Sequence, residues 1–89
     1  MTAAVDVTVS ASDAGWTADV TVRAKTTTTH RVRVSHAELA RYGGGDAADL
    51  VRRSFAFLLA RESNTSILRE FSLSDIERYF PEYRKEIAA

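Results

Sequence analysis

The chain has 89 residues, of which 45% are hydrophobic and 27% are charged, values typical of one compact globular domain rather than a disordered chain. Twelve Lys and Arg residues balance twelve Asp and Glu residues, which excludes a protein that coats nucleic acid or an anionic membrane through its overall charge. The absence of Cys excludes disulfides, thiol nucleophiles and cysteine-ligated zinc, and no apolar run approaches the roughly 20 residues that a transmembrane helix needs.

The first part of the chain predicts a three-stranded antiparallel meander, because β-branched residues alternate with polar ones and give each strand one apolar face. Asp13 and Gly15 supply turn chemistry between the first two strands. The threonine run 26–29 has high β propensity and no Gly, so it defines the second turn less clearly. The predicted strands lie at about 4–10, 16–25 and 29–35. The side chains expected to face inward are Val5, Val7, Val9, Trp16, Ala18, Val20, Val22, Ala24, Val32 and Val34.

The second part predicts helices that cover this sheet, since three strands with one apolar face are unstable alone. Ser35 and Glu38 have the spacing of a capping box, which begins a short helix that ends before the glycines at 43–45. Asp46 can cap a longer helix with an apolar stripe wide enough to pack on a sheet. Pro81 ends a later helix at the residue before it. The predicted helices lie at about 36–42, 46–62, 65–71 and 74–80, with a further helical turn at 81–87.

Together these elements predict an α+β fold: a three-stranded meander covered on one face by one long and two or three short helices. No internal repeat and no linker divides the sequence. Residues 1–89 are therefore expected to form a single domain.

The net charge of zero conceals a basic segment. Residues 1–19 contain three Asp and no basic residue, residues 20–34 contain four basic residues and no acid, and the remainder has nine acids against eight bases. If inward residues pair across the second hairpin, Val22 faces Val32 or Val34, and in either register two basic residues oppose each other on the exposed face. A bound anion or nucleic acid would relieve that repulsion. The candidate anion-binding residues are Arg23, Lys25, Arg31 and Arg33.

Two simpler arrangements account for the same charges without a ligand. The arginines can extend into water, or Asp6 and Asp19 on neighbouring strands can neutralise them. No aromatic residue falls at an outward position of the predicted sheet, so it lacks a surface on which bases stack. Nucleic-acid or anion binding is therefore the alternative function rather than the favoured one.

The sequence contains no catalytic or metal-binding constellation. No Ser lies in a G-x-S-x-G turn, and the glycines at 43–45 lack the Lys-Ser/Thr of a phosphate-binding loop. His30 and His36 lie at opposite ends of a predicted strand, too far apart to share a metal ion. The segment 65–80 is too acidic for a helix-turn-helix that reads DNA. We therefore expect no enzymatic activity, no cofactor and no bound metal.

The aromatic residues near the C-terminus, Tyr79, Phe80 and Tyr83, exceed what a terminal helix usually needs. They either complete the core or form an exposed contact for a protein partner or a second copy of the chain. An uncovered edge strand offers a second route to such a contact. The sequence thus favours a small non-enzymatic interaction or regulatory domain that acts through a protein partner or a homodimer, and it gives no support to membrane binding.

The first ten residues contain neither the basic nor the apolar region of a secretion signal, so a cytoplasmic location is expected. Ten Arg against two Lys, together with fourteen Ala, is typical of a protein from a GC-rich bacterium. The sequence thus predicts a small soluble bacterial domain.

Overall fold

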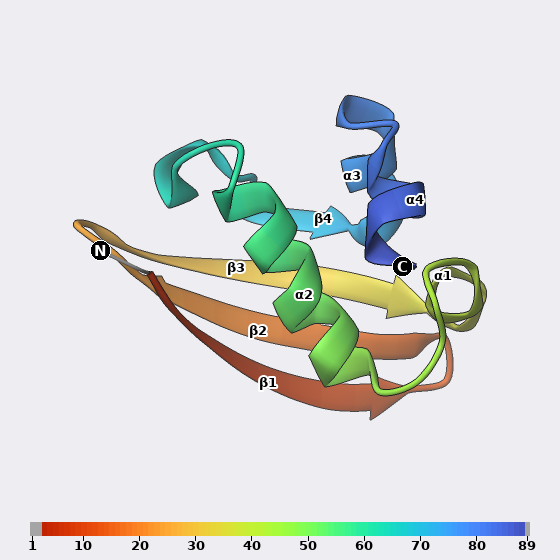
Figure 1. Ribbon diagram of the computed structural model, residues 1–89. Helices are drawn as coiled ribbons and strands as arrows, with labels where there is room; N and C mark the ends of the chain where they lie inside the picture. The colour runs from red at the N-terminus through yellow and green to blue at the C-terminus, as the bar shows by residue number, and fades with distance from the viewer. Residues whose placement is uncertain (1–2, 89) are drawn as a thin grey trace.

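The computed structural model describes residues 3–88 as a four-stranded sheet with helices packed on it (Figure 1). Strands β1 (Ala4–Ser12), β2 (Gly15–Arg23) and β3 (Thr27–Ser35) form an antiparallel meander, and β4 (Glu70–Ser72) pairs with β3 in parallel. The remaining elements are α1 (His36–Arg41), α2 (Ala47–Leu59), a 3₁₀ turn η1 (Asn64–Ser66), α3 (Leu73–Tyr79) and α4 (Tyr83–Ile87). The predicted α+β fold is confirmed, and it carries a fourth strand that the sequence did not indicate.

The turn between β1 and β2 depends on Gly15. Its φ of 139° lies in the region that favours glycine. A Cβ at this position would collide with the backbone carbonyl of Val34 on β3. Gly15 also pairs with Ser12 on one side and Ser35 on the other, so the missing side chain lets β2 approach both neighbours at this end of the sheet.

The second hairpin has a register that differs from both predicted ones. β2 ends at Arg23 and β3 begins at Thr27, so the turn is Ala24–Thr26 and its first residue, expected inward, is exposed. Val22 faces Thr28 rather than a valine of β3. The β propensity of the threonines explains this difference, because they extend β3 instead of forming the turn. The predicted opposition of basic residues across this hairpin is therefore wrong.

The helix predicted over 65–71 is replaced by a 3₁₀ turn and an extended segment. η1 covers only Asn64–Ser66, and the chain then runs through Ile67–Arg69 into β4. Within β4, Phe71 is buried between the exposed Glu70 and the half-buried Ser72, which is the alternation of a strand. A parallel strand pair needs a long crossover connection, which α1 and α2 provide between β3 and β4. Pairing with β3 therefore overrides the helical spacing of this segment.

Capping boxes begin two of the helices. Before α1, the Ser35 hydroxyl accepts from the Glu38 backbone N–H at 3.1 Å, and Glu38 Oε1 accepts from the Ser35 N–H at 2.9 Å, as predicted. Before α3, Ser72 is the capping residue and Asp75 completes the box. Helix α3 ends at Tyr79, one residue before the predicted end at Phe80 and ahead of Pro81.

The longer helix α2, predicted over 46–62, ends at Leu59. Beyond it the N–H groups of Arg61 and Glu62 both turn back to the carbonyl of Leu58, which closes the helix. The final helical turn, α4, begins at Tyr83, two residues after Pro81.

The core lies between the inward face of the sheet and the helical layer, with α2 crossing the sheet (Figure 1). Five inward residues of β2 and β3 are at most 2% exposed: Ala18, Val20, Val22, Val32 and Val34. Strand β1 is covered less completely: the inward Val5, Val7 and Val9 are only half-buried. The covering layer thus protects the middle of the sheet better than its β1 edge.

A buried carboxylate connects α1 to the beginning of α3. While Oε1 of Glu38 completes the capping box, Oε2 accepts from the backbone N–H of Ser74 at 2.8 Å and from its hydroxyl at 2.6 Å. Burial raises the pKa of Glu38, but the hydrogen bonds from Ser74 and Ser35 outweigh burial, so its pKa lies below the ordinary value of 4.5. The ionised carboxylate is therefore the form that fits the folded protein.

We expect Glu38→Gln to remove part of the acid sensitivity of the fold. Because the folded-state pKa is lowered, the carboxylate stabilises the protein fully above about pH 4.5, and this contribution is lost as the pH falls through the folded-state pKa. At neutral pH the variant should be about 1–3 kcal/mol less stable, since the amide group brings its own donors toward those of Ser74. Urea denaturation between about pH 3 and pH 7 measures both effects. An equally steep loss of stability in acid for the variant would assign the effect to other carboxyl groups.

Candidate protein-interaction site

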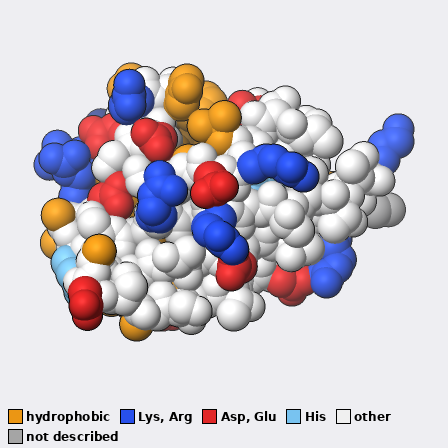
Figure 2. Space-filling model, turned by 180° about the vertical axis from the view of Figure 1, so that it is seen from behind, with side chains coloured by type: hydrophobic (Ala, Val, Ile, Leu, Met, Phe, Trp, Pro, Cys, Tyr) orange, Lys and Arg blue, Asp and Glu red, His pale blue; other side chains and the backbone are white. Residues whose placement is uncertain are grey.

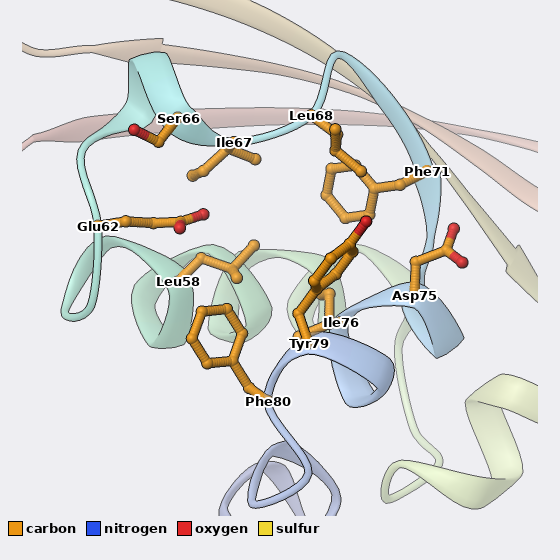
Figure 3. A pocket seen from close by; sticks show the side chains of 10 residues that line it. All are labelled: Leu58, Glu62, Ser66, Ile67, Leu68, Phe71, Asp75, Ile76, Tyr79 and Phe80. Atoms are coloured by element: carbon orange, nitrogen blue, oxygen red, sulfur yellow. The ribbon is translucent and has the colours of Figure 1, made fainter.

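An apolar groove opens beside β4, between the end of α2, the extended segment after η1 and α3 (Figure 3). Its volume is about 240 Å³. The apolar lining comes from all three segments and includes Leu58, Ile67, Leu68, Phe71, Tyr79 and Phe80. We call this hollow the C-terminal groove.

The two exposed large hydrophobic side chains within residues 3–88 are Leu68 and Tyr79, which expose 51% and 70% of their area. Both line the C-terminal groove, whose floor includes the buried Phe71 and Ile76. Single exposed apolar side chains are common on protein surfaces, but apolar residues that share one hollow form a continuous patch. This patch is the strongest candidate for a functional surface.

Buried polar side chains hold the wall that carries Leu68 against β3. The His30 ring donates from Nδ1 to the carbonyl of Leu68 at 2.8 Å, and its Nε2 bonds to the Thr28 hydroxyl at 2.8 Å. The ring proton at Nδ1 follows from its partner, because a carbonyl oxygen only accepts. Asn64 donates from Nδ2 to the Thr26 carbonyl at 2.7 Å and to the Thr28 hydroxyl at 2.8 Å. These bonds satisfy backbone groups of an irregular segment, so the wall has a defined position.

The three predicted interaction residues separate in the structure. Tyr79 is exposed, while Phe80 is half-buried in the groove, with its ring 5.9 Å from that of Phe57 in an edge-to-face arrangement. Tyr83 belongs to the core: it is fully buried, and its hydroxyl is 2.6 Å from the Ser54 hydroxyl. Burial raises the pKa of Tyr83 above its ordinary value. Tyr83 is therefore removed from the candidate surface, because its polar end has a partner inside the protein.

The rim of the groove is acidic. Glu62 and Asp75 line it, and no Lys, Arg or His does. Asp75 already accepts from the Ser72 backbone N–H at 3.0 Å and lies 3.6 Å from Arg78. Glu62 forms no ion pair within residues 3–88, and Figure 3 shows its side chain between those of Leu58 and Ile67. Glu62 thus places one carboxylate at the rim of the apolar surface without an ion-pair partner among the described residues.

Two of the four candidate anion-binding residues have carboxylate partners on the outer face of the sheet. Arg23 forms an ion pair with Asp6. Arg31 faces Asp19 across the β2–β3 pair and lies 3.3 Å from it. The prediction that neighbouring aspartates neutralise these arginines is confirmed, because the register brings opposite charges together.

The other two candidates lie far apart along the same hairpin. Lys25 is in its turn, whereas Arg33 lies near the opposite end of β3 and faces Thr17 and Ser72 on the adjacent strands. Figure 2 shows the outer face, where basic and acidic side chains are interspersed. The four residues do not form one basic patch, and anion binding by them stays a prediction.

Comparisons with other proteins add no assignment: the chain matches no protein-family model, and no curated protein or solved structure is significantly similar to it. Among the described residues, no group of three or more His, Asp or Glu side chains is placed to hold a metal ion. Within residues 3–88, none of the helices has the length and apolar character needed to cross a membrane.

Leu68 and Glu62 were not predicted as surface residues. Leu68 was expected in a helix over 65–71 that the structure replaces with a 3₁₀ turn and an extended segment, and Glu62 at the end of a helix over 46–62 that ends at Leu59. A usable signal was present: Phe71 and Leu73 alternate with polar residues, which is typical of an extended chain. No comparable signal marks Glu62, whose position depends on where α2 ends.

We expect Tyr79→Ser and Tyr83→Ser to distinguish surface from core. Tyr79 is 70% exposed, so its replacement should change the free energy of unfolding by about 0.5 kcal/mol or less. Tyr83 is fully buried, and its replacement should cost about 3–5 kcal/mol, chiefly because it leaves a cavity. The Ser54 hydroxyl keeps its bond to the Leu50 carbonyl but loses the hydrogen bond it makes with the Tyr83 hydroxyl. Urea denaturation followed by Trp16 fluorescence measures both values. Comparable losses for the two variants would contradict the assignment of Tyr79 to the surface.

Proposed function

We propose that the domain is a non-enzymatic protein-recognition domain whose C-terminal groove binds a short segment of a partner protein. One observation supports this most directly: Leu68 and Tyr79, the two exposed large hydrophobic side chains of the described chain, line the same hollow. Covering them would remove apolar surface from water at about 25 cal/mol per Å². A partner that reaches both gains more than one that touches either alone.

The size of the groove favours the side chains of a protein over a cofactor. Its volume of about 240 Å³ lies below the roughly 300–1,000 Å³ that is usual for small-molecule sites. A hollow of this size suits a few apolar side chains that one turn or two of an amphipathic helix presents together. The partner segment is therefore expected to be helical, with apolar residues on one face.

The charge at the rim specifies a second property of this partner. Glu62 lies beside the apolar lining and has no basic partner within residues 3–88. A Lys or Arg next to the apolar residues of the partner would meet this carboxylate. Charges at the edge of an interface contribute mainly to specificity and orientation. The proposed occupant is thus an apolar segment with an adjacent basic residue.

Anion or nucleic-acid binding through the second hairpin is the weaker alternative. Arg23 and Arg31 would have to exchange their carboxylate partners for the ligand. Such a function also predicts an affinity that falls steeply as the salt concentration rises. Binding through burial of apolar surface in the groove does not predict that salt dependence.

Nuclear magnetic resonance titration with synthetic peptides tests the proposal. The first peptide is an amphipathic helix with Leu on one face and flanking Lys, the second has Glu in place of Lys, and the third keeps Lys but has Ser in place of Leu. We expect the first to shift the amide signals of Leu68, Tyr79 and Phe80, and the other two to bind at least several-fold more weakly. Shifts confined to the β2–β3 hairpin, or equal binding of the first and third peptides, would contradict the proposal.

Two variants separate the charge from the apolar surface. Glu62→Gln should weaken binding of the Lys-containing peptide roughly twofold to fivefold, in line with an exposed ion pair of about 0.4–1 kcal/mol. Tyr79→Ser should weaken it further, because it removes apolar contact area. Asp13→Asn is the matched control, since it neutralises an exposed carboxylate in the β1–β2 turn, outside the groove lining. An equal effect of Asp13→Asn would mean that overall charge, and not Glu62, attracts the peptide.

A further inference from the structure

We propose that the chain forms a symmetric dimer in which β1 pairs with β1 of a second copy. β1 lies at one end of the strand order, and its nine residues pair only with β2. No other segment of the described chain forms a backbone hydrogen bond to it. The proposed dimer is independent of the C-terminal groove, whose lining includes Phe71 of β4. β4 lies at the opposite margin of the sheet from β1 (Figure 1).

β1 lacks the features that keep edge strands from pairing with other chains. Soluble proteins usually protect such edges with Lys, Pro, a bulge or a very short strand. β1 pairs with β2 through nine consecutive residues and contains no Pro and no basic residue. Its one charged side chain, Asp6, is neutralised by Arg23 of the same chain. The opposite edge strand, β4, has only three residues and leads directly into α3. The long open edge is therefore that of β1.

The inward valines of β1 are incompletely buried, so covering them with a further strand would stabilise the sheet. Val5, Val7 and Val9 face the helical layer but are only half-buried, whereas the inward valines of β2 and β3 are at most 2% exposed. A hollow beside the start of β1 is lined by Val5, Ala56 and Leu59, together with Arg52 of α2 and polar residues of the β2–β3 turn and of segment 62–65. A strand added beside β1 would cover the half-buried valines.

The sequence of β1 is suited to pairing with itself in antiparallel orientation about Thr8. In that register Thr8 faces the second copy's Thr8, Val7 faces its Val9, and Asp6 faces its Ser10. All nine residues pair, the inward Val5, Val7, Val9 and Ala11 face one another, and no like charges meet. A pair centred on Asp6 would oppose two carboxylates, and pairs centred on Val7 or Val9 would engage seven residues each. Charge complementarity and pairing length thus favour a second copy in one register.

The two-fold axis of such a pair runs perpendicular to the sheet. Because each strand keeps its alternation, the inward faces of both copies then lie on the same side. The result is one continuous sheet of eight strands, twice the four of a single chain, with the helices of both copies on one face.

The size of this contact sets its expected strength. Nine residues at about 3.4 Å each give an edge roughly 30 Å long, which at about 10 Å thickness buries roughly 600 Å² over both copies. Stable interfaces usually bury more than about 1,000 Å², so side chains of α2 must contribute and a reversible, micromolar dimer is expected.

Thr8 provides the test, because it is the one residue of β1 that faces itself in the proposed register. In the single chain its side chain is exposed and faces Asp19 across the β1–β2 pair, so Thr8→Lys should not harm the fold. In the dimer the substitution places two ammonium groups opposite each other. We expect sedimentation equilibrium between about 10 μM and 1 mM to give a dissociation constant raised roughly threefold to fivefold. Thr29→Lys, at an exposed position of β3 that faces Thr21, is the matched control and should leave it unchanged.

A complementary variant tests the register itself. Thr8→Glu alone should also weaken the dimer, but an equimolar mixture with Thr8→Lys should associate at least as strongly as the wild-type chain, because opposite charges then face each other. Hydrogen exchange should show β1 amides of the wild-type chain that become protected as its concentration rises. A wild-type chain that stays monomeric up to about 1 mM overturns the proposal. So does a dimer that ignores Thr8→Lys, or one that Tyr79→Ser dissociates, since the latter would place the contact at the groove.

Discussion

The hydrogen bonds from His30 and Asn64 attach the irregular segment 64–69 to β3, and the C-terminal half of the fold depends on this attachment. Both side chains are at most 5% exposed. His30 donates a hydrogen bond to the carbonyl of Leu68, and Asn64 donates one to the carbonyl of Thr26. A buried polar group left without a partner costs about 1–3 kcal/mol, so displacement of the segment is penalised at several atoms at once. The position of the segment in turn aligns β4 with β3 and sets where α3 begins.

The same attachment explains how exposed apolar side chains can lie on firm walls. His30 binds the backbone carbonyl of Leu68 on the side of β3. The side chain of Leu68 lines the groove. On the other side of the groove, hydrogen bonds connect α3 to α1 and to the residue that follows α1. Ser74 of α3 donates to the carboxylate of Glu38, and the hydroxyl of Tyr42 donates to Glu77 of α3 at 2.7 Å. Binding to walls already fixed in place loses less conformational entropy than binding to a mobile loop. A groove of modest volume can therefore still recognise a partner.

Local patterns in the sequence predicted the parts of the fold that local interactions determine. Alternation identified three strands, and the spacing of Ser35 and Glu38 identified the start of α1. The register of β2 with β3 was beyond such reasoning, because no Gly or Pro marks the turn at Ala24–Thr26. β4 depends on pairing with a strand more than thirty residues earlier, and no local pattern encodes that contact. Tyr83 is buried and Tyr79 is exposed. This difference also depends on a distant contact, because only the hydroxyl of Tyr83 reaches Ser54.

The charges of the outer face and the two sheet margins form a consistent arrangement. Arg23 pairs with Asp6 and Arg31 with Asp19 within the chain, so β1 would approach a second copy without net repulsion. In the proposed dimer the two β1 strands meet at the centre and the grooves lie beside the β4 strands at the far margins. With strands about 4.8 Å apart, seven intervals separate the two β4 strands by roughly 35 Å. Such a dimer would gain avidity only from partners that present two binding segments across that distance, or that are themselves dimeric. Self-association and partner recognition, although they use different surfaces, would then act together on the same class of partner.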